Sequence, residues 1–223
     1  MRLNEYFDKA FCINLDRRND RWEEVQPILI KENIEIERFS ACDGNKEFNL
    51  PIVEGGPASN AELGGAKSHM DVIVKAKELG LKNVLVFEDD VDLIPNINEE
   101  FSKVLGQIPD DWDMIYFGGN HVGGLLQFSP NVCRAGRTYA LQMYAVRDKF
   151  YDLAIKYYSD KIKWVLSGRQ PLKPSVAADY FIADLHQLIN CYVIKPHFSW
   201  QRKSYSDLAE NVVYYDFLKE NKI

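Results

Sequence analysis

Short apolar runs alternate with longer stretches of helical periodicity through the first half of this chain, and this order limits the folds open to it. The predicted strands are Phe11 to Leu15, Ile34 to Ser40, Asn83 to Phe87 and Met114 to Phe117. Between them, apolar residues recur every three or four positions, which is the spacing of amphipathic helices. Strands that alternate with helices form a mostly parallel α/β layer. We therefore predict an α/β fold with a mostly parallel central sheet flanked by helices.

The predicted helices have recognisable limits. The first includes Trp22 to Leu29, and Pro27 should kink it or make it restart, because an interior proline costs about 3 kcal/mol. The second covers Glu62 to Leu79, after a loop over Val53 to Gly65 that is rich in Gly, Pro, Ser and Asn. The third has Asn98 as its predicted N-cap.

The second half of the chain is less regular. Its predicted elements are an antiparallel strand over Ala140 to Val146, helices over Lys149 to Tyr158 and Asp179 to Asn190, and a strand over Cys191 to Lys195. Leu188 should lie on the buried side of its helix, and Ser167 to Ser175 should form a mobile loop. A length of 223 residues suits one substantial core, and no clean boundary divides it. We predict a single domain over 1–223.

Composition excludes several classes of protein. Lys and Arg number 27 against 33 Asp and Glu, and no basic run stands out, so nucleic acid is not expected as a partner. Four cysteines without a CxxC spacing support neither a zinc site nor a disulfide framework. No segment approaches the roughly 18 apolar residues of a membrane span, and Met1 to Ala10 does not resemble a signal peptide. The sequence therefore predicts a cytoplasmic protein without a transmembrane segment.

An acidic cluster follows one predicted strand directly. Glu88, Asp89 and Asp90 come after the apolar run Val84 to Phe87, and Asp92 lies one step further. Unit charges of like sign 4 Å apart repel by about 4 kcal/mol at the effective dielectric of a protein surface. Side chains alternate along a strand, so Glu88 and Asp90 should share a face. Ligands of open α/β sheets bind at the carboxyl ends of strands, which favours a divalent cation or a phosphate here; the alternative is a solvated acidic turn.

Several motifs in a fixed order extend this pattern over nearly the whole chain, from about Ala10 to Leu208. They are Ile13-Asn14-Leu15-Asp16-Arg17-Arg18, Arg21-Trp22, Ala41-Cys42-Asp43-Gly44, Gly64 to Ser68-His69, Phe87-Glu88-Asp89-Asp90-Val91, Gln201 and Ser206-Asp207-Leu208. In this order and spacing the sequence resembles glycosyltransferase family 25. That family includes bacterial lipooligosaccharide galactosyltransferases and collagen hydroxylysine galactosyltransferases.

The resemblance implies a GT-A fold, a nucleotide-sugar donor, a divalent metal at the acidic motif and inversion at the sugar carbon. By analogy, Asp90 binds Mn²⁺ or Mg²⁺, and Glu88 or Asp89 assists through the ribose or a metal-bound water. Such hard cations favour carboxylate and phosphate oxygens. His197 is a candidate third metal ligand, because GT-A enzymes often close the metal site with a late histidine. The nucleotide-binding half spans about 1–120 and the acceptor-binding half about 121–223.

The resemblance also assigns residues to the donor nucleotide. These cofactor-binding candidates are Asn14, Leu15, Asp16, Arg17, Arg21, Asp43, Gly64, Ser68, His69, Glu88, Asp89 and Gln201. Asp16 or the backbone beside it would contact uridine or ribose, and an arginine would lie near phosphate. We place Ser68 and His69 near the start of a helix, where anions bind well. A charged helix turn for Arg17 and a structural role for His69 are the alternatives.

An inverting transfer needs one base to take the proton of the acceptor hydroxyl, and a carboxylate within hydrogen-bond reach can do so. Asp179 is the first candidate and Asp184 the second, although Asp179 is also a plausible helix N-cap. Four aromatic residues are either sugar platforms or core: Trp164, Tyr180, Trp200 and Tyr205.

We therefore predict a metal-dependent inverting transferase that moves galactose or glucose from a UDP-sugar to a saccharide, glycolipid or hydroxylysine-type acceptor. The alternatives are an inactive relative that recognises carbohydrate and a metal-dependent hydrolase or phosphotransferase that uses the same carboxylates.

Overall fold

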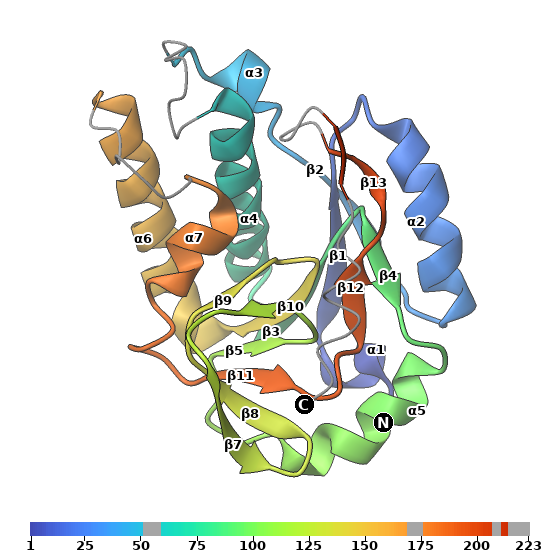
Figure 1. The fold of residues 1–223 in the computed structure, drawn as a ribbon. Helices are drawn as coiled ribbons and strands as arrows, with labels where there is room; N and C mark the ends of the chain where they lie inside the picture. Colours follow the sequence, from blue (N-terminus) through green and yellow to red (C-terminus); the bar gives the residue numbers. More distant parts are fainter. Residues whose placement is uncertain (51–58, 169–175, 207–210, 214–223) are drawn as a thin grey trace.

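The central element of the fold is an eight-stranded mixed sheet (Figure 1). The computed structural model describes residues 1–50, 59–168, 176–206 and 211–213. In spatial order the strands are β2 (Glu37–Ser40), β1 (Lys9–Asn14), β3 (Asn83–Glu88), β10 (Met143–Arg147), β5 (Met114–Tyr116), β11 (Cys191–Ile194), β8 (Val132–Ala135) and β7 (Leu125–Ser129). Strands β10 and β8 run against the other six. The predicted α/β fold, with a mostly parallel central sheet flanked by helices, is confirmed.

Helices cover both faces of this sheet, so its inner strands are buried on both sides. Side chains of β3 alternate between two cores: Val84 and Val86 belong to one, Leu85 and Phe87 to the other. The first core lies beneath α4 (Asn60–Glu78), α6 (Asp148–Leu166) and α7 (Ala178–Ala183). The second lies beneath α1 (Leu3–Tyr6), α2 (Asn19–Lys31) and α5 (Ile97–Val104) (Figure 1). Continuous burial explains the apolar runs in the sequence.

Short strand pairs and turns complete the fold. The remaining elements are α3 (Gly44–Glu47), the 3₁₀ turn η1 (Leu105–Gln107), and the antiparallel pairs β4 (Val91–Leu93) with β12 (Ser199–Gln201), β6 (Asn120–His121) with β9 (Thr138–Tyr139), and β13 (Ser204–Ser206) with β14 (Asn211–Val213). Among the described residues, none of the helices combines the length and apolar character that crossing a bilayer requires. The division of 1–223 into a nucleotide half and an acceptor half stays a prediction.

Two predicted helix limits in the first half are wrong, and the restart predicted as one possibility at Pro27 does not occur. Helix α2 continues through Pro27, which lies on its exposed side. Helix α4 already begins at Asn60, because Ser59 forms a capping box with Glu62, so the end of the predicted loop over 53–65 is helical. Residues 53–58 of that loop lie outside the described residues. The N-cap of α5 is Asn96 instead of Asn98.

The second half differs in the lengths of its helices. Helix α6 extends eight residues past the predicted end at Tyr158, to Leu166. Helix α7 is short and gives way to turns after Ala183, which leaves Leu188 74% exposed instead of buried. The predicted antiparallel strand is confirmed as β10, and its pairing with β3 places it in the middle of the sheet. The loop predicted over 167–175 lies outside the described residues from 169 onward.

Candidate active site

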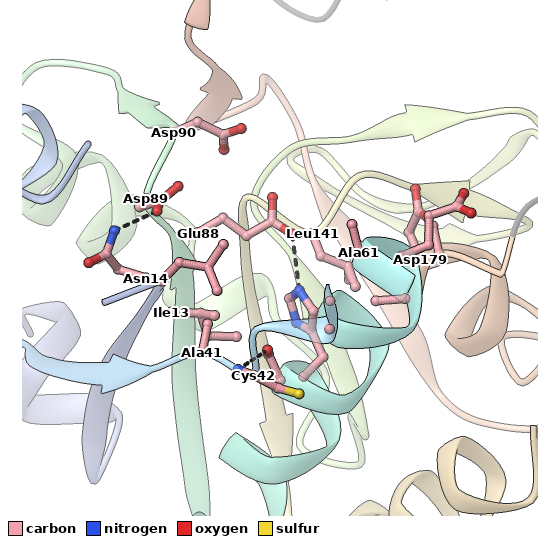
Figure 2. Close-up of a pocket in the computed structure, with 18 of the residues that line it drawn as sticks. Ile13, Asn14, Ala41, Cys42, Ala61, Glu88, Asp89, Asp90, Leu141 and Asp179 are labelled. Carbon is pink, nitrogen blue, oxygen red and sulfur yellow. Dashed lines mark hydrogen bonds and ion pairs between the residues drawn. The ribbon is translucent and has the colours of Figure 1, made fainter. Parts of the chain in front are cut away.

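A cavity of about 530 Å³ opens where β1, β2 and β3 end, between these strand ends and helices α4 and α7 (Figure 2). Of the predicted site residues, it is lined by Asn14, Leu15, Arg17, Arg21, Asp43, Ser68, His69, Glu88, Asp89, Asp90, Asp179 and Gln201. Asp16, Gly64, Asp184 and His197 do not line it. The carboxyl ends of parallel strands thus gather most of the predicted residues around one space.

Asp89 is fixed by neighbours on both of its oxygens. Arg21, from α2, donates from Nη1 to Asp89 Oδ1 at 2.6 Å, and Asn14, at the end of β1, donates to Asp89 Oδ2 at 2.7 Å. Burial, opposed by Arg21, raises the pKa of Asp89 to about 6. Because both oxygens are occupied, Asp89 holds the strand ends and Arg21 together.

Asp90 differs from Asp89 because one of its oxygens is unused. Arg21 Nη2 lies 3.2 Å from Asp90 Oδ2, but none of the described residues forms a hydrogen bond with the buried Oδ1. Gln201 Nε2 lies 3.4 Å from Asp90 Oδ2 and 3.5 Å from Glu88 Oε2, so Glu88 and Asp90 share one side. Burial first, and then the charge of Glu88, raise the pKa of Asp90 to about 6.

The turn that carries these acids is fastened by a segment more than a hundred residues away. Strand β12 pairs with β4, with Gln201 opposite Val91. The next residue, Arg202, donates from its backbone nitrogen to Asp90 O at 2.7 Å and from Nη2 to Asp89 O at 2.9 Å. These backbone contacts hold the turn rigidly although its side chains repel one another.

Glu88 is oriented by a buried relay. His69 Nε2 lies 3.0 Å from Glu88 Oε1, and His69 Nδ1 lies 2.8 Å from the Tyr144 hydroxyl. Burial holds the pKa of Tyr144 well above its ordinary value, so its hydroxyl keeps a proton to donate. Every group has a partner when Tyr144 donates to Nδ1 and Nε2–H donates to Glu88, which assigns the tautomer. Glu88 then keeps Oε2 for the cavity.

The expectation that Ser68 and His69 lie near a helix start is wrong, because both lie well inside α4. Ser68 Oγ donates to Gly64 O at 2.7 Å and accepts from Cys42 N at 2.9 Å. It therefore ties the loop after β2 to the helix. Gly64 also acts in packing, since a Cβ there would lie 2.6 Å from Gly44 N.

The remaining nucleotide candidates lie around the loops after β1 and β2. Asp43 accepts from Arg17 Nε at 3.4 Å, and both residues line the cavity. The Asp16 side chain is 71% exposed and accepts from Ser40 Oγ at 2.8 Å, outside the main cavity. Leu15 lies between these residues and contributes to the cavity wall.

Asp179 lies across the cavity from the three acids (Figure 2). Its Oδ2 accepts from Ala140 N at 3.0 Å and its Oδ1 accepts from Tyr180 N at 2.9 Å. Burial raises the pKa of Asp179 despite these two hydrogen bonds, which act in the opposite direction. The carboxylate is therefore held in one orientation and is more basic than an exposed aspartate.

Asp184, the second candidate base, lies in an ion network instead. It contacts Arg137 Nη2 at 2.5 Å, the Tyr157 hydroxyl at 2.8 Å and Lys161 Nζ at 3.2 Å. Burial acts to raise its pKa, but the hydrogen bonds from Tyr157, Arg137 and Lys161 outweigh burial and lower the pKa overall. Asp184 does not face the cavity; it holds Arg137, which in turn donates to the hydroxyl of the cavity residue Tyr139.

The predicted metal ligands are only partly brought together. His197 lies away from the acids, with its Nε2 2.7 Å from His121 Nε2 and 3.5 Å from Lys195 Nζ. Among the described residues, no group of three or more His, Cys, Asp or Glu side chains is arranged to hold a metal ion. Asp90 and Glu88 nevertheless fit a cation, because Gln201 Nε2 reaches both carboxylates and the buried Oδ1 of Asp90 accepts no hydrogen bond from the described residues. Phosphate oxygens of a ligand would have to complete such a shell.

The cavity also contains aromatic residues that we did not predict together. Tyr139 and Tyr180 stack with ring centroids 4.3 Å apart and an interplanar angle of 20°, and both line the cavity beside Asp179. Asn120, opposite Tyr139 in the β6–β9 pair, lines it as well. No spacing in the sequence marks Tyr139, Asn120 or the buried Tyr144, because strand pairing over long separations brings them here. Asp207 and Leu208, from the last predicted motif, lie outside the described residues.

Comparisons with known proteins match half of this chain or somewhat more. Residues 7–122 match the sequence model of glycosyltransferase family 25 (LPS biosynthesis protein). Human procollagen galactosyltransferase 2 is 30% identical over 129 residues, and the match covers 50% of this chain and 21% of that protein. A glycosyltransferase 25 family member of Drosophila pseudoobscura is 33% identical over 128 residues, with 50% and 20% covered. Human inactive glycosyltransferase 25 family member 3 is 28% identical over 162 residues, with 63% and 27% covered. The matches thus span only about a fifth to a quarter of these relatives.

Proposed function

This chain belongs to glycosyltransferase family 25, and from that membership we propose that it transfers galactose or glucose from a UDP-sugar to a hydroxyl acceptor, with inversion and with a divalent metal. The observation that carries the proposal is the unpaired oxygen of Asp90. Asp90 lies beside Glu88 at the end of β3, in a cavity whose opposite wall holds Asp179, and burial raises the pKa of Asp179. In this proposal the leaving group and the acceptor hydroxyl would lie on opposite sides of the cavity.

Asp90 and Glu88 would hold Mn²⁺ or Mg²⁺ together with the donor diphosphate. The bound metal would supply positive charge where the departing diphosphate gains negative charge. Asp89 would support the site instead of coordinating the metal, because its carboxylate is already paired with the Arg21 cation and accepts from Asn14. Arg21 itself is fixed by Asp89 and Asp90 at the cavity, where its guanidinium suits phosphate.

The end of β1 and the loop after β2 would hold the nucleoside. Asn14 and Leu15 line the cavity there, and Arg17 and Asp43 line it from the neighbouring loop. Asp16 lies outside the main cavity, so the backbone beside it, instead of its carboxylate, would contact the ribose. His69 would act on the donor only through Glu88, which it orients.

Asp179 would take the proton of the acceptor hydroxyl. Its raised pKa makes it a stronger base, and its two backbone hydrogen bonds leave each oxygen a further lone pair. Asp184 would not compete for this role, because its three cationic or hydroxyl partners lower its pKa. A saccharide, glycolipid or hydroxylysine-type hydroxyl would enter from this side.

This proposal can be tested by incubating the purified protein with Mn²⁺ and a panel of UDP-sugars, with and without EDTA. We expect calorimetric UDP binding that requires Mn²⁺, and donor hydrolysis or transfer. Asp90→Ala should abolish the metal-dependent binding, whereas the control Asp152→Ala, at an exposed acid of α6, should not. Absence of both UDP binding and turnover would refute the proposal.

If the protein binds UDP but neither hydrolyses nor transfers the donor sugar, it is a family member without catalytic activity. That alternative is concrete, since the human relative named as inactive matches a longer stretch of this chain than the human galactosyltransferase does. The crowded acids around Asp90 favour the active form, because they cost stability unless they bind a cation.

A further inference from the structure

The stacked pair Tyr139 and Tyr180 forms part of the cavity wall. The two rings cover each other, at a centroid separation of 4.3 Å. The Arg137 guanidinium lies 5.8 Å from the Tyr139 ring centroid, and its Nε donates to the Tyr139 hydroxyl at 2.7 Å. Arg137 therefore holds the pair at Tyr139, and both rings line the cavity.

Asp179 is the junction that brings the two tyrosines together. It accepts one hydrogen bond from the backbone nitrogen of Tyr180 and another from that of Ala140, the residue that follows Tyr139. Ala140 has a φ of 70°, a left-handed conformation that a non-glycine residue adopts only under constraint. The carboxylate thus fixes the stack and lies next to it, so a ligand on Tyr180 is close to the proposed base.

The groups around the stack suit a sugar. Tyr180 contributes a hydroxyl to the lining of the cavity, and Asn120, which lies opposite Tyr139 in the β6–β9 pair, contributes an amide. Hydroxyl and amide groups around an aromatic face recognise a pyranose, whose C–H face packs on the ring while its hydroxyls bond at the edge. An ammonium group would compete with Arg137, which already provides a cation at this stack.

We propose that Tyr180, backed by Tyr139 and Arg137, is the acceptor subsite and that the acceptor is a saccharide, not a hydroxylysine side chain. The inference rests on the proposed transferase function and narrows its acceptor. Asp184 stabilises this subsite indirectly, because its Oδ1 forms an ion pair with Arg137 Nη2 at 2.5 Å. The pyranose packs on the Tyr180 ring and directs one hydroxyl to Asp179.

Steady-state kinetics of Tyr180 variants test this subsite, with methyl β-galactoside, methyl β-glucoside and free hydroxylysine as acceptors. Tyr180→Ala should raise the acceptor KM at least tenfold, while the donor KM and the rate of donor hydrolysis stay within twofold. Tyr180→Trp should retain the wild-type acceptor KM. Phe128→Ala, which removes an exposed ring on β7 outside the cavity, is the matched control and should change neither constant.

A binding measurement keeps the test independent of turnover. Saturation-transfer NMR with the same glycosides should show binding to the wild type and a loss of the signal in Tyr180→Ala, even if the chain does not hydrolyse a donor. An unchanged acceptor KM or NMR signal in Tyr180→Ala, or transfer to hydroxylysine and to neither glycoside, would overturn the proposal. Loss of UDP binding in the wild type would instead refute the transferase function itself.

Discussion

Asp90→Asn should make the metal-free protein more stable at neutral pH. The pKa of Asp90 rises from 3.8 to about 6 in the folded protein, and each unit of pKa corresponds to about 1.4 kcal/mol. Asparagine imitates the protonated carboxyl, so the substitution should recover about 3 kcal/mol at pH 7.5. For a chain of this length that gain corresponds to a rise in Tm of roughly 6–12 °C.

The pH dependence of this gain follows from the direction of the shift. The folded state binds the Asp90 proton more tightly than the unfolded state, so the cost of the charge is fully present above pH 6. It decreases as the pH falls from 6 toward 3.8, where the carboxyl is protonated in both states. The difference in Tm between Asp90→Asn and wild type should therefore shrink steadily between pH 6.5 and pH 4.5.

Differential scanning calorimetry in EDTA measures this difference at each pH. Asp152→Asn is the control, because the Asp152 side chain is 82% exposed and should give a difference near zero throughout. Asp90→Asn should also lose Mn²⁺-dependent UDP binding, so that stability and ligand binding change in opposite directions. A Tm at pH 7.5 equal to or below that of wild type, or a gap that does not depend on pH, would refute the reasoning.

Three further predictions address the base, the relay and the packing of α4. Asp179→Asn should lower kcat for transfer by roughly 10²–10⁴-fold with little change in donor KM, as measured by initial rates; an unchanged kcat would move the base elsewhere. Tyr144→Phe should cost about 1–3 kcal/mol in chemical denaturation, because it leaves a buried imidazole nitrogen without a donor. Gly64→Ala should destabilise the fold, since its Cβ would lie 2.6 Å from a backbone nitrogen, whereas Gly65→Ala meets nothing within 4 Å and should stabilise the helix by about 1 kcal/mol. Equal effects of the two alanine substitutions would contradict this account of the packing.

The sequence predicted the strands and the acidic turn because burial on both faces leaves continuous apolar runs that end at the site. It placed the start of α4 too late, because the glycines at 64 and 65 suggested a loop. Gly64 is instead a point of close approach to Gly44, and the capping box of Ser59 and Glu62 was the signal to follow.

Contacts over long separations were beyond sequence reasoning. The position of His197 beside His121, and that of Tyr139 beside Tyr180, depend on how β6 and β9 pair and on where α7 packs. Asp179 was ranked above Asp184 by the family resemblance alone, since both are acids of one predicted helix. The structure separates them, through the early end of α7 after Ala183 and the ion network around Arg137.

The attachment of the acidic turn by Gln201 and Arg202 has a consequence for how the protein is made. Those residues are synthesised more than a hundred positions after Asp89 and Asp90. While the chain is still on the ribosome, the three acids lack these contacts, and the turn can take its final shape only after β12 has emerged and paired with β4. Ligand binding should therefore be among the last properties that a nascent chain acquires, well after the nucleotide-binding strands have formed.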